Sequence, residues 1–372
     1  MTAAGSTCRA RRPSATSPSS SPRQPTPAAA DPRSRIPLQD LPVVAVVGAT
    51  GAAGGTLLRV LEDRVFPIGD FHALASARSA GSLVRFRDHD VTVGEVSDDI
   101  LAASDIVFFA AGGATSRRFA PVVAAAGGVA VDKSSAYRMD PAVPLVVPEV
   151  NAAALRGHAG IVANPNCVAI PLAVVLGPLH ARYGLRHVTV ATYQAASGGG
   201  RALAAELAAQ ERDDAYGRPP TRQVYPHVLH GNVVPGGWAM VGDDTEEETK
   251  VIGEVRRVLD LPELPIGVTT VRVPVSVGHA AAVWVELDQP ADAAEARELL
   301  ANAPGVLVVD DAATQQYPTP RAVAGCDEVH VGRIRADRSR GNGLALFLAV
   351  DNLRKGAATN AVQVAELLLL EG

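Results

Sequence analysis

The amino-acid sequence predicts an α/β fold whose N-terminal part is a Rossmann-like, doubly wound parallel sheet. Apolar runs typical of buried strands recur along this part and alternate with glycine turns and helical segments. The runs are Pro42–Val47, Phe71–Ala75, Asp105–Ala111 and Gly128–Asp132. A helix is expected from about Ser116 to Ala126, between the third and fourth runs. The chain has 372 residues, of which 47% are hydrophobic, and this length favours a second domain.

The first of these runs enters a glycine-rich turn. Pro42–Val47 is continuously apolar, which is typical of a strand covered on both faces. Gly48, Gly51 and Gly54 follow with the spacing G-x-x-G-x-x-G, and Thr56–Leu61 then has helical character. In this context glycines let the backbone approach a pyrophosphate, which binds at the helix N-terminus. The turn predicts a dinucleotide site, although tight packing of a strand against a helix would produce the same spacing.

The second run, Phe71–Ala75, leads to the residues that should meet the adenosine ribose. A site that prefers NAD usually carries Asp or Glu here to accept a hydrogen bond from the ribose 2′-hydroxyl. This chain instead has Ser76, Arg78 and Ser79. A guanidinium and hydroxyls suit a 2′-phosphate, so we interpret the cofactor as NADP. The alternative is that Arg78 is a solvated loop arginine.

Composition and charge exclude several classes of protein. The net charge of −5 provides no basic surface for nucleic acid or an acidic membrane. No apolar run approaches the roughly 20 residues of a membrane-spanning helix. The three cysteines, Cys8, Cys167 and Cys326, are too few and too scattered for a disulfide framework or a zinc site. We therefore expect a cytoplasmic protein with no metal, no nucleic-acid partner and no membrane partner.

Residues 1–40 are predicted to lie outside the fold. They are rich in Pro, Ser and Arg and show almost no apolar periodicity. Such a segment does not bury enough surface to offset the entropy of ordering. A transit peptide would have a similar composition, but we favour a disordered tail or a start codon assigned too early. We exclude Cys8 from chemistry on this ground.

Cys167 is the candidate nucleophile. It follows the turn Asn164-Pro165-Asn166 and precedes a continuous apolar stretch, 168–179, that is typical of a buried helix. Pro171 is tolerated only in the first helical turn, which places Cys167 at or beside the N-cap. A free thiol is only about 3% thiolate at pH 7, and a helix N-terminus and a nearby imidazole would raise that fraction. Backbone N–H groups at the helix start could hold an oxyanion, whereas a lone cysteine is more often a buried structural residue.

Together with several other segments in the same order, these motifs resemble those of aspartate-β-semialdehyde dehydrogenases. The most specific are Asn164–Cys167 and Thr192–Gly198, which reads TYQAASG. The resemblance covers Pro42 to Glu371. Further matching segments are 43–51, 75–81, 134–138, 143–151, 272–279, 331–335 and 351–358.

The resemblance implies a reductive dephosphorylation. NADPH would reduce L-aspartyl-4-phosphate to L-aspartate-4-semialdehyde and release phosphate, in the biosynthesis of lysine (through diaminopimelate), threonine and methionine. Cys167 then matches the nucleophile that forms a thioester, His279 the general acid/base, and Gln194 the residue that positions the substrate. The substrate-binding positions that the resemblance implies are Arg272 for the α-carboxylate, Arg138, Asn166 and Lys250 for the phosphate, and Glu248 for the amine.

The resemblance also implies how the chain is divided. An NADP-binding domain, 41–165, would be completed by a C-terminal helix within 351–372. An α+β catalytic and dimerisation domain with a mixed sheet would occupy 166–345. The family is homodimeric or larger, so we expect a homodimer or tetramer. The implied cofactor positions are Gly48, Thr50, Gly51, Ala52, Ser76, Arg78, Ser79, Ser197, Gly198 and Asn352.

The residue types agree with these roles, but some have a plainer alternative. An acyl phosphate and an α-carboxylate need separate cationic clamps, and arginine forks suit both. Taken alone, His279 would be interpreted as a loop histidine. Lys250 could be a solvated helix residue paired with Glu246, four positions earlier. For His279 to face the same pocket as Arg272, a turn at Gly278 must redirect it.

Lys133 departs from the family pattern, which usually has Asn at this position. It could add positive charge to the phosphate–nicotinamide region or pair with Asp132. Two other functions stay open, an N-acetyl-γ-glutamyl-phosphate reductase with the same Cys/His chemistry and a non-catalytic paralogue acting as a regulatory dimer. Arg138, the segment Arg272–His279 and the Glu-x-Lys element favour the aspartyl substrate. The presence of Cys167 and of a histidine at the general acid/base position argues against the paralogue.

Overall fold

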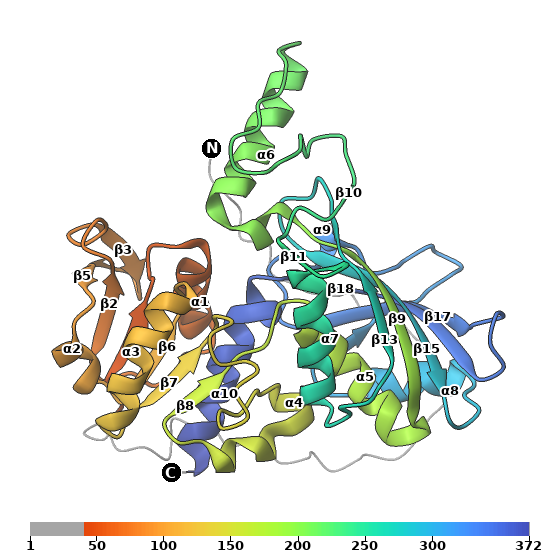
Figure 1. The fold of residues 1–372 in the computed structure, drawn as a ribbon, viewed down its shortest axis with the longest axis horizontal. Coiled ribbons are helices and arrows are strands. Elements are labelled where there is room, and N and C mark those ends of the chain that lie inside the picture. Colours follow the sequence, from red (N-terminus) through yellow and green to blue (C-terminus); the bar gives the residue numbers. More distant parts are fainter. Residues whose placement is uncertain (1–40, 372) are drawn as a thin grey trace, which may run out of the picture.

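The computed structural model describes residues 41–371, which form two six-stranded sheets with helices packed on them (Figure 1). The tail expected at 1–40, with Cys8, lies outside the described residues. Within 41–371 no helix is long and apolar enough to cross a membrane. The same residues contain no cluster of His, Cys, Asp or Glu that could hold a metal ion.

The first sheet is parallel throughout, with the order β5-β2-β1-β6-β7-β8, and it confirms the predicted doubly wound fold. The hairpin β3 (Leu83–Phe86) and β4 (His89–Thr92) lies between β2 and β5 in the chain. The strand order reverses between β1 and β6, and ligands bind beyond the carboxyl ends of strands at such a point. The strands are β1 (Val44–Val47), β2 (Phe71–Ala75), β5 (Gly94–Glu95), β6 (Ile106–Phe109), β7 (Val129–Asp132) and β8 (Ile161–Ala163).

Helices cover both faces of this sheet because alternate strand residues enter two different cores. Val44 and Val46 pack with α1 (Ala52–Asp63) and α10 (Thr359–Glu371) on one face. Ala45 and Val47 face α2 (Asp98–Ala102) and α3 (Gly113–Ala125) on the other. Helix α3 begins earlier than we expected because the glycine pair forms its start, with extended Gly112 as the N-cap.

The second sheet is mixed, as predicted, with the order β13-β9-β15-β18-β17-β16. The pairs β13–β9 and β16–β17 are parallel, and the other three pairs are antiparallel. Two further two-stranded ribbons, β10–β14 and β11–β12, lie beside it. The strands are β9 (Leu185–Tyr193), β10 (Val234–Pro235), β11 (Met240–Val241), β12 (Asp244–Thr245), β13 (Ile266–Thr269), β14 (Val271–Arg272), β15 (His279–Leu287), β16 (Val306–Val308), β17 (Val329–Ala336) and β18 (Gly343–Val350).

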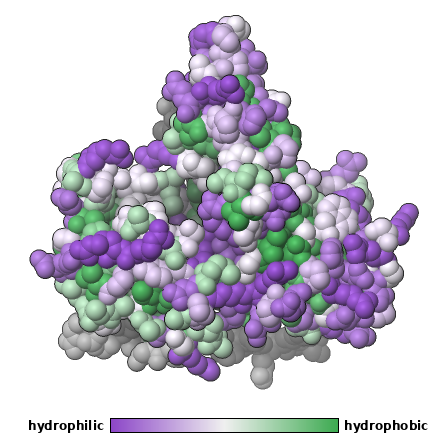
Figure 2. Space-filling view, in the orientation of Figure 1, coloured by the Kyte–Doolittle hydropathy of each residue, from purple (hydrophilic) through white to green (hydrophobic). Residues whose placement is uncertain are grey.

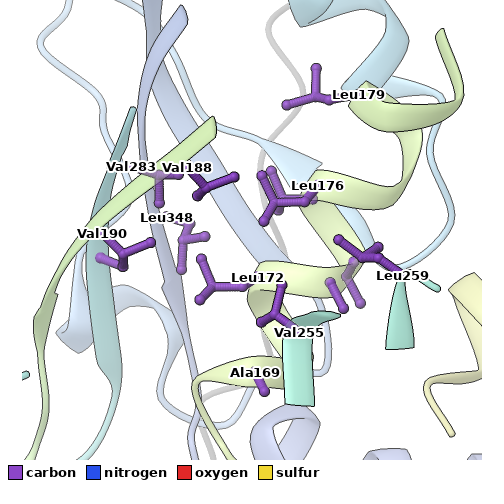
Figure 3. Close-up of a cluster of buried hydrophobic side chains, with 14 of the residues drawn as sticks. Ala169, Leu172, Leu176, Leu179, Val188, Val190, Val255, Leu259, Val283 and Leu348 are labelled. Carbon is purple, nitrogen blue, oxygen red and sulfur yellow. The ribbon is translucent and has the colours of Figure 1, made fainter. Parts of the chain in front are cut away.

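Helix α5 (Ala169–Tyr183) is the centre of the second core, and it is apolar and buried along most of its length. Figure 3 shows Leu172 and Leu176 pointing toward Val188 and Val283 of the sheet, with Val255 from α7 (Glu246–Val258) on the other side. Burying each such leucine contributes about 1.5–3 kcal/mol. This packing holds the N-terminus of α5, and therefore Cys167, in one place.

The C-terminal helix returns to the first sheet through a buried ion pair. Lys355 lies in the π-helical turn Arg354–Ala358 and is completely buried. Its Nζ donates to Glu149 Oε2 and Gln363 Oε1, both at 2.7 Å. Glu149 belongs to α4 (Pro148–Asn151), so this contact fixes α10 against the segment that leads into β8. In Figure 1, α10 lies between the two sheets.

Helix α6 (Gly200–Ala215) projects away from both sheets (Figure 1). The chain returns along it because buried Glu206 accepts hydrogen bonds from the backbone N–H groups of Gln223, Val224 and Tyr225. Gln210 in the same way accepts from the N–H groups that follow Val228. The projecting arm, defined here as residues 200–241, is therefore held in shape by polar side chains of α6. Two further short helices, α8 (Ala293–Ala301) and α9 (Pro320–Val323), pack on the mixed sheet.

Candidate active site

A cavity of about 520 Å³ lies between the two sheets, beyond the carboxyl ends of the parallel strands. Its wall combines the glycine turn after β1, the loops after β7 and β8, the end of β9 and the start of the C-terminal segment. Predicted site residues in the wall are Gly51, Ala52, Arg138, Asn166, Cys167, Gln194, Ser197, Gly198, Arg272 and Asn352. Tertiary structure therefore brings together most of the residues that the sequence predicted from distant segments.

Cys167 lies in the cavity wall, between the end of β8 and the start of α5. The side chain of Asn166 accepts a hydrogen bond from the Val168 N–H at 2.7 Å, which satisfies an N–H group at the helix start. Gly356 approaches from the C-terminal segment, and a Cβ on it would lie only 3.3 Å from the Cβ of Cys167. Cys167 is thus held between two helix termini, with its thiol at the cavity.

The sequence led us to expect a raised thiolate fraction at Cys167, and the structure shows the opposite. Burial, followed by the negative charge of Glu247, raises the pKa of Cys167 to about 12, against the opposing effects of Arg138 and Arg272. Burial, followed by the charge of Arg272, lowers the pKa of His279 to about 3. At neutral pH the structure therefore holds a thiol and a neutral imidazole.

His279 is placed by backbone contacts around it. Gly278 has φ 95°, and a Cβ there would lie 2.4 Å from the carbonyl oxygen of Pro320, so only glycine makes this turn without strain. The Nδ1 atom of His279 accepts a hydrogen bond from the Ala195 N–H at 3.0 Å. The proton of the neutral ring is therefore on Nε2, which has no partner among the described residues. His279 is set to donate a hydrogen bond from Nε2.

Arg272 is buried next to His279 and shares the same backbone anchor. Its Nη1 donates to the Ala195 carbonyl at 2.8 Å, and its guanidinium stacks 4.6 Å from the ring centre of Trp238. Its Nε has no partner in the part of the chain described. A Cβ on Gly198 would lie 2.9 Å from His279 Nε2 and 3.0 Å from Arg272 Nη1, so only glycine at this position leaves room for both groups.

Gln194 and Asn166 are joined by a carboxylate that the sequence analysis missed. Glu247 Oε1 accepts from Gln194 Nε2 at 3.0 Å and from Asn166 Nδ2 at 3.1 Å. Glu247 is buried and lines the cavity. Helical periodicity carries the signal that could have found it, because Glu247 lies one turn before Val251 on the face of α7 that enters the core.

Glu248 does not reach the cavity, so the structure corrects its expected contact with the substrate amine. Its carboxylate forms the capping box of α7 with Thr245 and also accepts from the backbone N–H of Thr270 at 2.8 Å. These hydrogen bonds lower the pKa of Glu248 although burial, the largest single effect, raises it. Lys250 also lies outside the cavity wall. It forms the i,i+4 ion pair with Glu246 that the sequence offered as the alternative to a phosphate contact.

Arg138 reaches the cavity, but protein acceptors surround its guanidinium. It donates to the Asn164 carbonyl at 2.9 Å, to Glu254 Oε1 at 3.0 Å and to the Lys133 carbonyl at 2.7 Å. Glu254, also missed from the sequence, accepts in addition from the Asn166 N–H. Arg138 thus fixes the loops after β7 and β8 relative to α7 and supplies positive charge behind Cys167.

The glycine turn after β1 fits a dinucleotide. Gly48 has φ 87°, and a Cβ there would lie 2.7 Å from the Ala110 carbonyl oxygen, while a Cβ on Gly54 would lie 2.1 Å from the Gly48 oxygen. These close approaches bring β1, α1 and β6 together, and no side chain caps the start of α1 at Gly51. At the far side, Asn352 Oδ1 accepts from Ser197 Oγ at 3.1 Å.

The residues expected at the ribose lie apart from the cavity wall. Ser76 and Arg78 are exposed in the turn after β2, and Ser79 is half-buried there. Because β2 is the parallel neighbour of β1, this turn lies at the same sheet edge as the glycine turn. The guanidinium of Arg78 is open to solvent and free to meet an anion.

Comparison with known proteins agrees with this geometry. Residues 43–158 match the family model for the NAD-binding domain of semialdehyde dehydrogenases, and residues 176–355 match the model for their dimerisation domain. The aspartate-semialdehyde dehydrogenase of Prochlorococcus marinus is 43% identical over 335 residues, covering 90% of this chain and 98% of that protein. This chain belongs to the aspartate-semialdehyde dehydrogenase family.

Other members of the aspartate-semialdehyde dehydrogenase family are equally similar. The Legionella pneumophila protein of that name is 45% identical over 332 residues, covering 88% of this chain and 96% of its own. The crystal structure of aspartate semialdehyde dehydrogenase II from Vibrio cholerae, complexed with ASA, superimposes with a TM-score of 0.85 at 40% identity. The match covers 89% of this chain and 99% of that chain. The family predicted from the sequence is therefore confirmed.

Proposed function

We propose that this protein uses NADPH to convert L-aspartyl-4-phosphate to L-aspartate-4-semialdehyde and phosphate through a thioester on Cys167. The observation that carries the proposal is the charge of the cavity wall around the thiol. Four cationic side chains and one carboxylate line it: Lys133, Arg138, Arg201, Arg272 and Glu247. The substrate has the complementary set, with a phosphoryl group and an α-carboxylate as anions and one α-ammonium as cation.

The arrangement suits acyl transfer to sulfur. The Cys167 sulfur attacks the acyl carbon, the bond from that carbon to the phosphate oxygen breaks, and the thiol proton leaves with the phosphate. A bound dinucleotide would supply the hydride that reduces the thioester carbonyl. His279 Nε2–H, which has no partner among the described residues, would donate a hydrogen bond to the oxygen on which negative charge develops. Breaking the carbon–sulfur bond would then release the aldehyde, and the Cys167 sulfur would take up a proton from solvent.

Reduction of NADP⁺ in the reverse direction tests the function directly. Wild-type protein with aspartate semialdehyde and phosphate should form NADPH, and arsenate should replace phosphate. N-acetyl-glutamate semialdehyde should be a poor substrate. A protein that binds NADPH but turns over neither aldehyde would instead be the non-catalytic paralogue.

Glu247 favours an aspartyl substrate, with its free α-ammonium, over an N-acetylated one. A free α-ammonium offers a charged partner to Glu247, whereas an N-acetyl group would leave this buried carboxylate with only the amide donors of Gln194 and Asn166. We expect Glu247→Gln to raise the KM for aspartate semialdehyde about tenfold or more, since a charged hydrogen bond contributes about 1.5–3 kcal/mol. Steady-state kinetics with varied aldehyde give the value.

The matched control for that variant is Glu246→Gln. Glu246 pairs with Lys250 outside the cavity wall. The KM of Glu246→Gln for aspartate semialdehyde should therefore stay close to that of the wild type. A second measurement follows from electrostatics, because loss of the Glu247 charge lowers the pKa of Cys167 and should speed its alkylation. Equal KM values for the two glutamine variants would contradict the assignment of Glu247.

NADP is the proposed cofactor, and Arg78 its proposed 2′-phosphate ligand. We expect Arg78→Glu to raise the Kd for NADP⁺ about tenfold or more, because a charged hydrogen bond is replaced by repulsion. The Kd for NAD⁺ should change little, since NAD⁺ lacks the 2′-phosphate. Titration of both nucleotides by protein fluorescence measures the two values. Arg85→Glu, an exposed cation in the same domain, is the control, and a parallel loss of both nucleotides in Arg78→Glu would refute the assignment.

A homodimer is the proposed assembly, formed through the second face of the mixed sheet. Helices α5, α7 and α8 pack into the core on its first face, whereas Trp284, Ala282 and Phe347 are only partly buried on the other. Tyr193, at the end of β9, lies 6.0 Å from the Phe347 ring and is also exposed. On the side shown in Figure 2, hydrophobic surface also gathers near the base of the projecting arm. A dimer would cover such apolar surface.

Trp284→Arg should therefore convert the dimer to a monomer. The arginine would place a charge in the apolar centre of the proposed interface, where burial without a partner is costly. Sedimentation velocity measures the change in mass. Leu83→Arg, on the exposed hairpin of the first domain, also replaces an apolar side chain with arginine and should leave the dimer intact. An unchanged mass for Trp284→Arg would place the interface on another surface.

Within a cell we expect the enzyme to act in the cytoplasm.

A further inference from the structure

Lys133 lines the cavity beside Cys167. It directly follows the last residue of β7, and Cys167 follows the neighbouring parallel strand β8, so both lie beyond the same edge of the sheet. The backbone of Lys133 is held on both sides: its N–H donates to the Phe109 carbonyl at 3.1 Å, and its own carbonyl accepts from Arg138 at 2.7 Å. The side chain thus extends from a fixed point on the cavity wall.

The ammonium group of Lys133 has no hydrogen-bond or ion-pair partner among residues 41–371. Asp132, its neighbour, is already occupied, because its carboxylate accepts from Ser116 Oγ and Ser134 Oγ at 2.7 Å and from the Ser134 N–H at 3.0 Å. The alternative of a Lys133–Asp132 pair is therefore not formed. Burial, followed by repulsion from Arg138, lowers the pKa of Lys133 to about 8, so most molecules still carry the positive charge at pH 7.

We propose that Lys133 binds the phosphoryl group of the substrate beside Cys167, an inference that rests on the proposed function. An ammonium offers three donors and no acceptor, which suits phosphate oxygens. The other cations expected at the phosphate are engaged: Lys250 pairs with Glu246 outside the wall, and Arg138 donates to three protein acceptors. Lys133 presents unused donors beside the thiol that displaces the phosphate from the acyl carbon.

The cofactor pyrophosphate has the same chemistry as the substrate phosphate and must be distinguished from it. The glycine turn around Gly51, with the N-terminus of α1, already provides a site for the pyrophosphate. Lys133 lies two strands away from that turn, because β6 separates β7 from β1. The position of Lys133 beside Arg138 and Cys167 favours the substrate phosphate.

Protection of Cys167 by inorganic phosphate tests the inference without turnover. Alkylation by iodoacetamide is followed by mass spectrometry on the peptide that contains Cys167, at increasing phosphate concentration. We expect saturable protection in the wild type and a half-protecting concentration about tenfold or more higher in Lys133→Gln. Lys133→Arg keeps the charge and should stay within about threefold of the wild type. The KM for phosphate in the reverse reaction should rise in parallel, with a smaller change in kcat.

Other results would overturn either the Lys133 inference or the proposed function, and the two can be told apart. Absence of phosphate protection in the wild type, or an unchanged half-protecting concentration in Lys133→Gln, overturns the inference. A higher half-protecting concentration in Lys250→Gln but not in Lys133→Gln also overturns it. A rise in the Kd of Lys133→Gln for NADP⁺, with normal phosphate protection, overturns it as well. If phosphate protects in a Lys133-dependent manner but the wild type does not turn over aspartate semialdehyde, the proposed function fails while the phosphate site stands.

Discussion

Cys167→Ala is expected to lower turnover of aspartate semialdehyde by about 10⁴-fold or more, because no other group in the wall can hold the acyl group as a thioester. Cys167 lies between the loop after β8 and the C-terminal segment, with Gly356 close to its Cβ. The remaining wall offers cations, amides, one carboxylate and the Ser197 hydroxyl, none of which forms a thioester. Formation of NADPH from semialdehyde, phosphate and NADP⁺ gives the rate.

Binding measurements separate a chemical effect from a structural one. Alanine at position 167 removes only the sulfur atom, so the Kd for NADP⁺ and the thermal midpoint should stay near their wild-type values. Rapid quenching of the wild type under turnover, followed by mass spectrometry, should find the acyl group on the Cys167 peptide. Full activity in Cys167→Ala, or the acyl group on another peptide alone, would exclude the thioester mechanism.

Arg272→Gln is expected to lower kcat/KM for aspartate semialdehyde about 10³-fold. Removing one partner of a buried, hydrogen-bonded charge pair costs about 2–5 kcal/mol, and here the partner is the substrate α-carboxylate. Arg272 is buried, with its Nε unpaired among the described residues and its Nη1 on the Ala195 carbonyl. Steady-state kinetics report the loss.

The same variant has a second readout through His279. After burial, the charge of Arg272 is the next cause that lowers the pKa of His279, so its removal should raise that pKa. The acid limb of the pH–rate profile should then move to higher pH, because imidazolium forms sooner as the pH falls. A wild-type kcat/KM in Arg272→Gln would contradict the clamp, and an unmoved acid limb would show that His279 does not govern that limb.

The acid positions on α7 show where sequence analysis was insufficient. The run Glu246, Glu247 and Glu248 contains three identical side chains, and the resemblance placed the substrate contact on Glu248. A helix turns 100° per residue, so the three point in different directions: to solvent beside Lys250, into the cavity, and back to the capping box. Helical periodicity identifies the inward position only once the core face of α7 is known.

The protonation state of Cys167 could not be predicted from the sequence either. Its place beside a helix N-terminus predicted a lowered pKa, and the helix does begin two residues later. Burial and the charge of Glu247, which is 80 positions away in the chain, dominate instead and raise the pKa. The energy of a charge depends on every group within a few ångströms, and those groups come from several elements.

The sequence by itself determined the doubly wound sheet, the glycine turn, the position of Cys167 beside a helix N-terminus, and the family. These follow from local patterns: continuous apolar strands, glycine spacing, and a proline, Pro171, that is best tolerated in the first turn of a helix. Only the tertiary structure decided that Glu247 enters the cavity, that Lys250 stays outside it, and that the ammonium of Lys133 is left unpaired beside the thiol. The physical reason is that burial and electrostatic fields are sums over neighbours distant in the chain, and folding alone brings those neighbours together.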